Sequence, residues 1–269
     1  MEQGEIRCSC RGRGSCRAEE PLVAEWWVHR LPGLGCHAMC KDIHEVAPLF
    51  GTDYIEQGYN KLMQHYLAGN KNPELLWRLT RATLETADLD KNHWRRAQLI
   101  CEGRTYGIEA AFYAENNPNA LRWAAVATAY YCDFLSGQEK IEECKKSIDY
   151  TLKGLRINPD DHVLLFIKGR WMLYFCGLSS LEKERVRHVF HLTGREPTVS
   201  VGQAQATLMR AYSIEPRHLP TLQYLALCWL AQGDASMAKY YLKEALDLRV
   251  EGCNLHVQAE CAQLFRQCV

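Results

Sequence analysis

The chain has 269 residues and carries 32 lysines and arginines against 32 aspartates and glutamates, so its formal net charge is zero. Such a balance argues against a protein that coats DNA, RNA or an acidic membrane, because those partners favour an excess of positive charge. Apolar residues make up 47% of the chain, which indicates a soluble globular protein. No run of about 18 apolar residues is present, so we expect no transmembrane anchor.

Residues 1–47 differ from the rest and are predicted to be a disordered, cysteine-rich leader. They show no sustained helical period, and they hold Cys8, Cys10, Cys16, Cys36 and Cys40. The chain has 13 cysteines, an odd number, and no signal peptide, so we expect free thiols in a reducing compartment. Zinc binding by these cysteines and His37 is the less favoured alternative, because neither close pair has Cys-x2-Cys spacing. No metal or cofactor is therefore predicted.

From Pro48 onward the sequence predicts helices, about ten or eleven of them. Prolines stand at the edges of these segments, and Asn72 with Pro73 and Asn117 with Pro118 are expected to open two helices. Asparagine caps free backbone amides and proline suits the first helical turn. Pro159 and Pro216 are expected to open two more. The prolines recur roughly every 40 to 60 residues, a spacing typical of stacked helix pairs.

The last predicted pair is the clearest and begins at Leu219. Its small and large side chains follow the tetratricopeptide pattern, with Leu222, Leu225, Ala226, Trp229, Ala238, Leu242 and Ala245 at the expected places. Small residues let two helices approach closely, and large ones fill the layers between them. Gly233 is expected to end the first helix and Asp234 to cap the second. In the preceding pair, Gly169 takes the place of Ala226.

The third pair contains a predicted insertion at about 177–197, with a short extra helix around 181–187. Apolar residues at 54–66 and 254–268 predict an opening and a closing helix that cover the two ends. The sequence thus predicts an all-α fold over 48–269, a tetratricopeptide-like, right-handed superhelical stack of about four antiparallel helix pairs.

Three stretches resemble the regulator of microtubule dynamics family: ELLWRLTRA at 74–82, ERVRHVF at 184–190 and AKYYLKEA at 238–245. The segment from Asn158 through Gly169 to Phe175 continues the likeness, which covers most of the chain after residue 50. The resemblance implies a microtubule-associated protein of the cytoplasm, located on the cytoskeleton or spindle, with mitochondria as an alternative location. Some members of that family carry an N-terminal membrane anchor, which this sequence does not predict.

Motifs of catalysis are missing from the sequence. It has no Gly-x-x-x-x-Gly-Lys phosphate loop, no Gly-x-Ser-x-Gly elbow and no His-Glu-x-x-His pair. His188 and His191 are spaced to share a metal on one helix face, but no third ligand is visible, so packing or surface histidines are favoured. We therefore expect an interaction module and not an enzyme.

Basic residues that would meet the acidic tails of tubulin are few. The candidates are Arg95, Arg96, Lys183, Arg185 and Arg187. Acidic partners reward clustered positive charge, yet Glu182 and Glu184 dilute the second cluster. A solvated, charged surface is the alternative interpretation.

The concave face of the predicted stack is the other candidate site. In tetratricopeptide stacks the first helix of each pair lines the concave face through fixed repeat positions. Counted along this chain, those positions fall on Trp77, Leu84, Arg122, Val163, Phe166, Arg170, Tyr174, Gln223, Leu227 and Leu230. An apolar groove with two arginines suits an acyl chain with an anionic head, or an amphipathic helix. This predicts two alternative functions, a phospholipid-binding or transfer module at organelle contact sites and a scaffold for a partner's helix. A third possibility is that the protein's own helices fill the groove.

Overall fold

The computed structural model describes residues 43–190, 199–252 and 254–268, and within these ranges it contains helices and no strand. Eleven α-helices follow a short 3-10 helix, in agreement with the predicted number. Their bounds are η1 (Ala47–Leu49), α2 (Ile55–Leu67), α3 (Pro73–Leu89), α4 (His93–Tyr113), α5 (Pro118–Cys132), α6 (Gly137–Ile157), α7 (His162–Gly177), α8 (Ser180–Val189), α9 (Val201–Ile214), α10 (Leu219–Ala231), α11 (Ala235–Asp247) and α12 (Asn254–Gln267).

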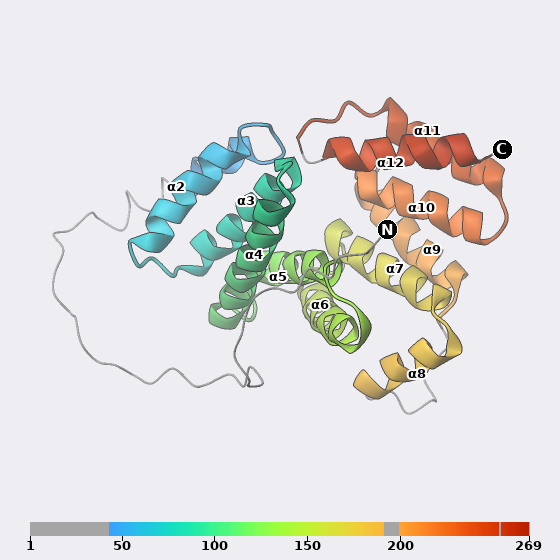
Figure 1. Ribbon diagram of the computed structural model, residues 1–269, viewed down its shortest axis with the longest axis horizontal. Coiled ribbons are helices and arrows are strands. Elements are labelled where there is room, and N and C mark those ends of the chain that lie inside the picture. The colour runs from blue at the N-terminus through green and yellow to red at the C-terminus, as the bar shows by residue number, and fades with distance from the viewer. Residues whose placement is uncertain (1–42, 191–198, 253, 269) are drawn as a thin grey trace.

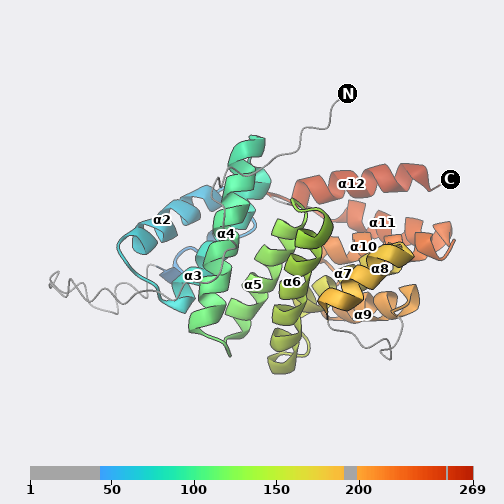
Figure 2. The ribbon, with the colours of Figure 1, turned by 60° about the horizontal axis from the view of Figure 1, so that its bottom comes forward.

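The helices stack as four pairs, which confirms the predicted helical-repeat fold. α3 packs with α4, α5 with α6, α7 with α9, and α10 with α11 (Figure 1). α2 packs on α3, and α12 packs on α11 and α10, so an opening and a closing helix cover the ends. α8 is the extra helix of the third pair and lies against α6. Figure 2 shows α4, α5 and α6 side by side, which is the row that stacked pairs produce.

Asparagine caps open α3 and α5 as predicted. The side chain of Asn72 accepts a hydrogen bond from the backbone N–H of Glu74, and Asn117 caps the next pair in the same way. Pro159 and Pro216 behave differently, because α7 begins only at His162 and α10 only at Leu219. These two prolines lie in the turns that lead into the helices, and α10 begins at Leu219, as the sequence predicted.

Small residues sit where helices approach most closely. A methyl group on Gly169 would lie 2.6 Å from Cγ of Leu208, so α7 and α9 approach each other with no room for a side chain. Gly233 has φ +82°, and its N–H and that of Asp234 donate to the carbonyls of Leu230 and Trp229. This hydrogen-bond pattern closes α10, and the carboxylate of Asp234 then caps α11, as the sequence predicted.

The residues before α2 run along the face of α3 that α4 and α5 leave open. The guanidinium of Arg81 lies 4.1 Å from the centre of the Phe50 ring. One turn further along α3, Glu85 accepts a hydrogen bond of 2.7 Å from the backbone N–H of Gly51. The segment before α2 therefore covers this face of the first unit, a place for which the sequence had suggested the protein's own helices.

Because of this segment, the folded domain begins earlier in the chain than the sequence predicted. Ile43 is 2% exposed and Val46 is fully buried, and both belong to the core shared by α2 and α3. The predicted boundary at residue 48 was thus too late, because a short irregular segment has no helical period to reveal its burial. The remaining leader, with its candidate zinc ligands, lies outside the described residues.

The two ends of the stack touch each other (Figure 1). A Cβ atom on Gly252, in the loop before α12, would lie 3.1 Å from the carbonyl oxygen of Gly51, in the loop before α2. A polar cavity of about 290 Å3 lies at this junction, bordered by Gly51, Arg217 and Arg249 among others. The helix pairs are therefore held at both ends and between neighbours.

Candidate functional site

Arg122 projects from the second turn of α5 and is held by the next unit. Its Nε and Nη2 lie 2.6 Å from Oδ2 of Asp161, whose side chain is fully buried. The other oxygen of Asp161 accepts hydrogen bonds of 3.1 Å from the backbone N–H groups of Val163 and Leu164. Asp161 thus caps α7 and pairs with Arg122 at the same time, and it fixes the second unit to the third.

Arg170, one unit further along, is also paired. One of its terminal nitrogens lies 2.9 Å from each carboxylate oxygen of Asp133, and its guanidinium lies 5.8 Å from the centre of the Tyr224 ring. Burial alone would lower the pKa of Arg170, but Tyr224 and Asp133 outweigh burial and raise it. Both arginines assigned to an anionic ligand head are therefore engaged in links between units.

Three of the predicted groove residues lie inside the protein. Leu84 is 1% exposed and packs in the core, and Trp77 is 9% exposed, with its indole N–H donating to Glu74 at 3.0 Å. Gln223 donates to Glu260 of α12 at 2.8 Å, so the closing helix covers it. These residues cannot line an open groove. Helical wheels alone do not show that α2, α4 and the N-terminal segment together enclose α3.

The remaining groove candidates are half-buried, except Tyr174, which is 42% exposed. Phe166 makes edge-on contacts with His218 and Tyr224, at 5.2 and 5.4 Å between ring centres. Val163 packs against the core between α5 and α7, and Leu230 packs against the core of the last pair. Leu227 is half-buried on the same helix. What the structure brings together is an aromatic contact between α7 and α10, continuous with the core.

His218 is the titratable group of this contact. Burial, and then the neighbouring His162, lower the pKa of His218 to about 3. Its Nδ1 lies 2.7 Å from the Thr221 hydroxyl, which the neutral ring accommodates. Burial also lowers the pKa of His162, with Arg122 adding to the effect and Asp161 and Glu215 opposing it.

We expect the protein to lose stability as the pH falls below about 6.5, the usual pKa of histidine. Below that pH the histidine is protonated in the unfolded chain but stays neutral at buried His218 in the folded one. The contribution of His218 to the free energy of unfolding is therefore complete above pH 6.5 and is lost progressively towards pH 3. Between pH 6.5 and 5 the loss from His218 is about 2 kcal/mol, at about 1.4 kcal/mol per pH unit. Urea unfolding at pH 7.5 and 5.0 measures it. His218→Gln should reduce the pH dependence by that amount, and an unchanged pH dependence would contradict this assignment.

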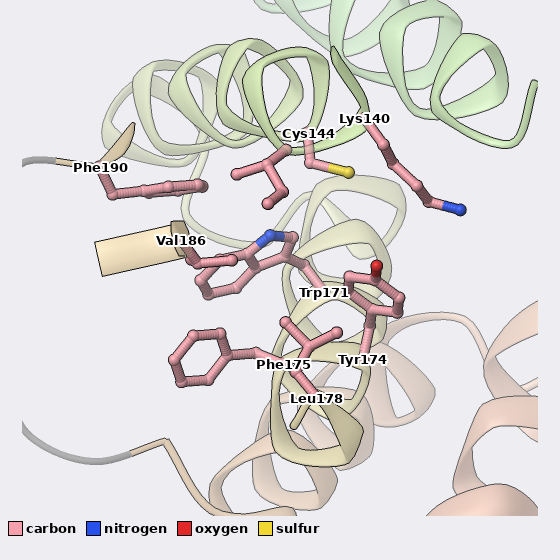
Figure 3. A pocket seen from close by; sticks show the side chains of 9 residues that line it. Lys140, Cys144, Trp171, Tyr174, Phe175, Leu178, Val186 and Phe190 are labelled. Carbon is pink, nitrogen blue, oxygen red and sulfur yellow. The ribbon is translucent and has the colours of Figure 1, made fainter. Parts of the chain in front are cut away.

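A small aromatic hollow lies between α6, α7 and α8 (Figure 3). The ring of Trp171 stacks on Phe175 at 5.5 Å between ring centres and lies 5.2 Å from Phe190. Val186 is the buried residue of α8 and closes this contact. The hollow has a volume of about 10 Å3, room for about one water molecule. It anchors the inserted helix and is too small to hold an acyl chain.

The two predicted basic clusters lie apart, on α4 and α8 (Figure 1). Arg95 pairs with Glu56 at 2.6 Å, and Arg96 lies 3.4 Å from the buried carboxylate of Asp88. The charges of these two arginines are therefore largely neutralised within the protein. The α4 cluster connects α2, α3 and α4, and it offers little charge to a partner.

The α8 cluster is more open. Lys183 donates to the carbonyl of Cys176 at 3.1 Å, and Arg187 pairs with Glu184 at 3.1 Å on its own helix. Arg185 is exposed and acts on Glu182 only through its charge. α8 thus packs Val186 and Val189 on the core and leaves Arg185 exposed, with Lys183 and Arg187 half-buried.

Neither a metal-ligand cluster nor a membrane-spanning helix is found in the described part of the chain. No three His, Cys, Asp or Glu side chains gather there in a way that would hold a metal ion. His188 is exposed on α8, and its predicted partner His191 lies outside the described residues. Among the described helices, none combines the length and the apolar character needed to cross a bilayer.

Comparison with known proteins identifies a family whose model matches this chain. The family model described as regulator of microtubule dynamics protein 1-3 matches residues 42–268. Regulator of microtubule dynamics protein 1 of Caenorhabditis elegans is 27% identical over 221 residues, which cover 82% of this chain and 96% of that protein. Protein 2 of the same name from Rattus norvegicus is 27% identical over 199 residues, 72% of this chain and 47% of that protein.

A solved structure agrees with the fold. The crystal structure of a thermophilic TPR protein from Thermus thermophilus superposes with a TM-score of 0.58 and 14% identity, over 84% of this chain and 98% of that one. At this identity the likeness shows the helical-repeat architecture alone.

Proposed function

Because the chain belongs to the regulator of microtubule dynamics family, as its sequence predicted, we propose that it is a non-catalytic interaction protein that binds microtubules and regulates their dynamics. The single observation that carries this proposal is the family match over residues 42–268, on a helical-repeat fold. The chain spans 96% of the worm relative but only 47% of the rat one, so activities of the longer relatives are carried over here as part of the proposal. We place its action in the cytoplasm, on the cytoskeleton or the spindle, with mitochondria as the alternative location.

The basic side of α8 is the surface that we assign to tubulin. α8 is an insertion whose one buried residue is Val186, with Val189 packed beside it. Its other side chains are therefore not needed to stack the repeats. Arg185 is exposed on it, and Arg187 lies half-buried beside Glu184. Acidic tails attract cations at such a surface through long-range electrostatic forces. Arg95 and Arg96 are weaker candidates because their ion pairs join α4 to α2 and α3, whereas the pair of Arg187 stays within α8.

The two groove functions have less support. A phospholipid module would need Arg122 and Arg170 for the head group, and both are paired with carboxylates of the neighbouring unit. A scaffold for a partner helix would need an open groove, and the segment with Phe50 and Gly51 already lies along α3.

Co-sedimentation with taxol-stabilised microtubules tests the proposal. We expect the protein to pellet at low salt and to bind more weakly at physiological salt, because screening weakens contacts between exposed charges. Arg185→Glu combined with Arg187→Glu should weaken binding by about threefold or more at low salt. The matched control is Lys153→Glu with Arg156→Glu, which makes the same change of net charge on exposed positions of α6.

The two double variants separate a local surface from a general charge effect. Binding that the control retains and the α8 variant loses supports the assignment to α8. An equal loss in both would show that net charge alone decides and would remove α8 from the proposal. If the unmodified chain does not pellet at any salt concentration, the microtubule function itself is wrong.

A further inference from the structure

The polar cavity where the two ends of the stack meet is formed by three segments that lie far apart in the sequence. Gly51 comes from the loop before α2, Arg217 from the turn before α10, and Arg249 from the connection between α11 and α12. The first and last of these segments lie side by side in Figure 1. Because both ends contribute to the lining, the cavity is complete only while the ends touch.

Two arginines without ion-pair partners distinguish this cavity. Arg217 and Arg249 are both exposed, and within the described ranges neither lies in an ion pair with a carboxylate. Arg210, on the helix before Arg217, shows the usual arrangement in this protein, because it pairs with Asp160 at 2.6 Å. Two unpaired guanidinium groups therefore border one space. The guanidinium group is the side chain best suited to bind carboxylate and phosphate oxygens.

The two arginines favour a phosphate group over a single carboxylate. A carboxylate has two oxygens, which the fork of one guanidinium satisfies, whereas a phosphate monoester has three free oxygens and nearly two negative charges. Glu251 also lines the cavity and offsets one of the two positive charges. A dianion gains more from the remaining positive charge than a monoanion does, so the balance of charge again favours phosphate.

The volume and the other lining residues limit the kind of molecule that carries the phosphate. The cavity has about 290 Å3, near the lower end for small-molecule pockets, which leaves no room for acyl chains. Among the described residues that line it, none has an aromatic ring on which a nucleotide base would stack. Glu251 can accept hydrogen bonds from hydroxyl groups, and the amide of Asn254 can donate and accept them. These groups suit a small molecule with several hydroxyl groups.

We infer that this cavity binds the phosphate group of a small hydroxylated molecule, of the class of the sugar phosphates, through Arg217 and Arg249. Such a ligand finds its complete site only while the two ends are in contact. It therefore stabilises the contact between Gly51 and Gly252 by mass action. This inference is independent of the proposed binding to microtubules, which we assign to α8.

Thermal unfolding of the full chain with glucose 6-phosphate tests the inference. We expect about 10 mM of this compound to raise the melting temperature by about 2–5 °C, because it binds the folded chain and not the unfolded one. Inorganic phosphate should give a smaller rise. Glucose at the same concentration, and sodium chloride at the same ionic strength, should give none. If neither phosphate compound raises the melting temperature more than sodium chloride does, the inference is wrong.

A pair of double variants locates the site. Arg217→Gln combined with Arg249→Gln should weaken the binding of glucose 6-phosphate by about tenfold or more in isothermal titration calorimetry, because both guanidinium groups are removed. The matched control is Arg156→Gln with Arg266→Gln, which removes the same charge from exposed positions that do not line the cavity. Equal weakening in both double variants would show that net charge alone attracts the phosphate and would overturn the site.

Glu251→Gln tests the position of the anion with an effect of the opposite sign, and it keeps both arginines. Inorganic phosphate should bind this variant about threefold more tightly, because a like charge no longer repels it. Glucose 6-phosphate should gain less, since an amide oxygen accepts hydrogen bonds from hydroxyl groups less strongly than a carboxylate does. Weaker binding of inorganic phosphate by this variant would contradict the placement of the anion beside Glu251.

Amide hydrogen exchange tests the link between the two ends. With glucose 6-phosphate bound, exchange should slow by about threefold or more both in the loop that holds Gly51 and in the first turn of α12, because the ligand contacts both. Glucose at the same concentration should leave both rates unchanged. Protection at one end alone would show that the ligand does not join the ends, and the inference would then be wrong.

Discussion

Leu208→Ala should lower the free energy of unfolding by about 2–5 kcal/mol, because it empties a fully buried position between α7 and α9. Gly169→Ala should lower it by about 1–3 kcal/mol, because its new methyl group would meet Cγ and Cδ2 of Leu208 at 2.6 and 2.8 Å. The double variant should lose less than the sum of the two, since the methyl group then fills part of the space that the leucine vacates. Urea unfolding of the four proteins measures all three values.

Gly202→Ala is the matched control for this pair. It also adds a methyl group to a helical glycine, but the nearest atom is the hydroxyl oxygen of Ser200 at 3.9 Å. It should change stability little or raise it by up to about 1 kcal/mol, because alanine favours the helix over glycine. Strict additivity of Gly169→Ala and Leu208→Ala would show that the two side chains do not share the space.

Asp161→Ala should destabilise the protein by about 2–4 kcal/mol. The variant loses the cap of α7, typically worth about 1–2 kcal/mol, and it leaves Arg122 without its buried partner. Asp161→Asn should cost about half as much, because the amide oxygen can still cap the helix while the charge is lost. The free energy of unfolding in urea distinguishes the two variants.

A second pair of variants isolates the link between units. If Arg122→Met is combined with Asp161→Ala, the loss should be smaller than the sum, because each single variant already removes the ion pair. Equal losses for Asp161→Ala and Asp161→Asn would mean that the cap contributes nothing. In that case the pairing with Arg122 would account for the whole effect.

Much of the fold could be predicted because the pattern of side-chain size is local. Gly169 and Ala226 mark the close approaches within pairs, and Gly233 with Asp234 marks a helix end and the next start. Each of these signals is read within about one turn of helix. The four pairs, the inserted α8 and the two covering helices follow from such signals.

The candidate groove could not be predicted in the same way, because contacts between residues far apart in the sequence decide whether its side chains are open to a ligand. Arg122 finds Asp161 and Arg104 finds Glu143, each 39 residues further along the chain. Tyr130 reaches back 42 residues to Asp88. Such partners lie one repeat apart, so they become neighbours only after the units have stacked. A charge that has no partner nearby in the sequence is therefore already paired in the protein.

The contact between Gly51 and Gly252 changes how a chain of repeats should come apart. In an open array the outermost units have one neighbour each, so they fray first and the middle outlasts them. Here each outermost loop has the opposite end as its second neighbour. The stack therefore has no end with a single neighbour. Local unfolding of one end also removes a contact from the other end, so we expect α2 and α12 to exchange their amide hydrogens with solvent at similar rates.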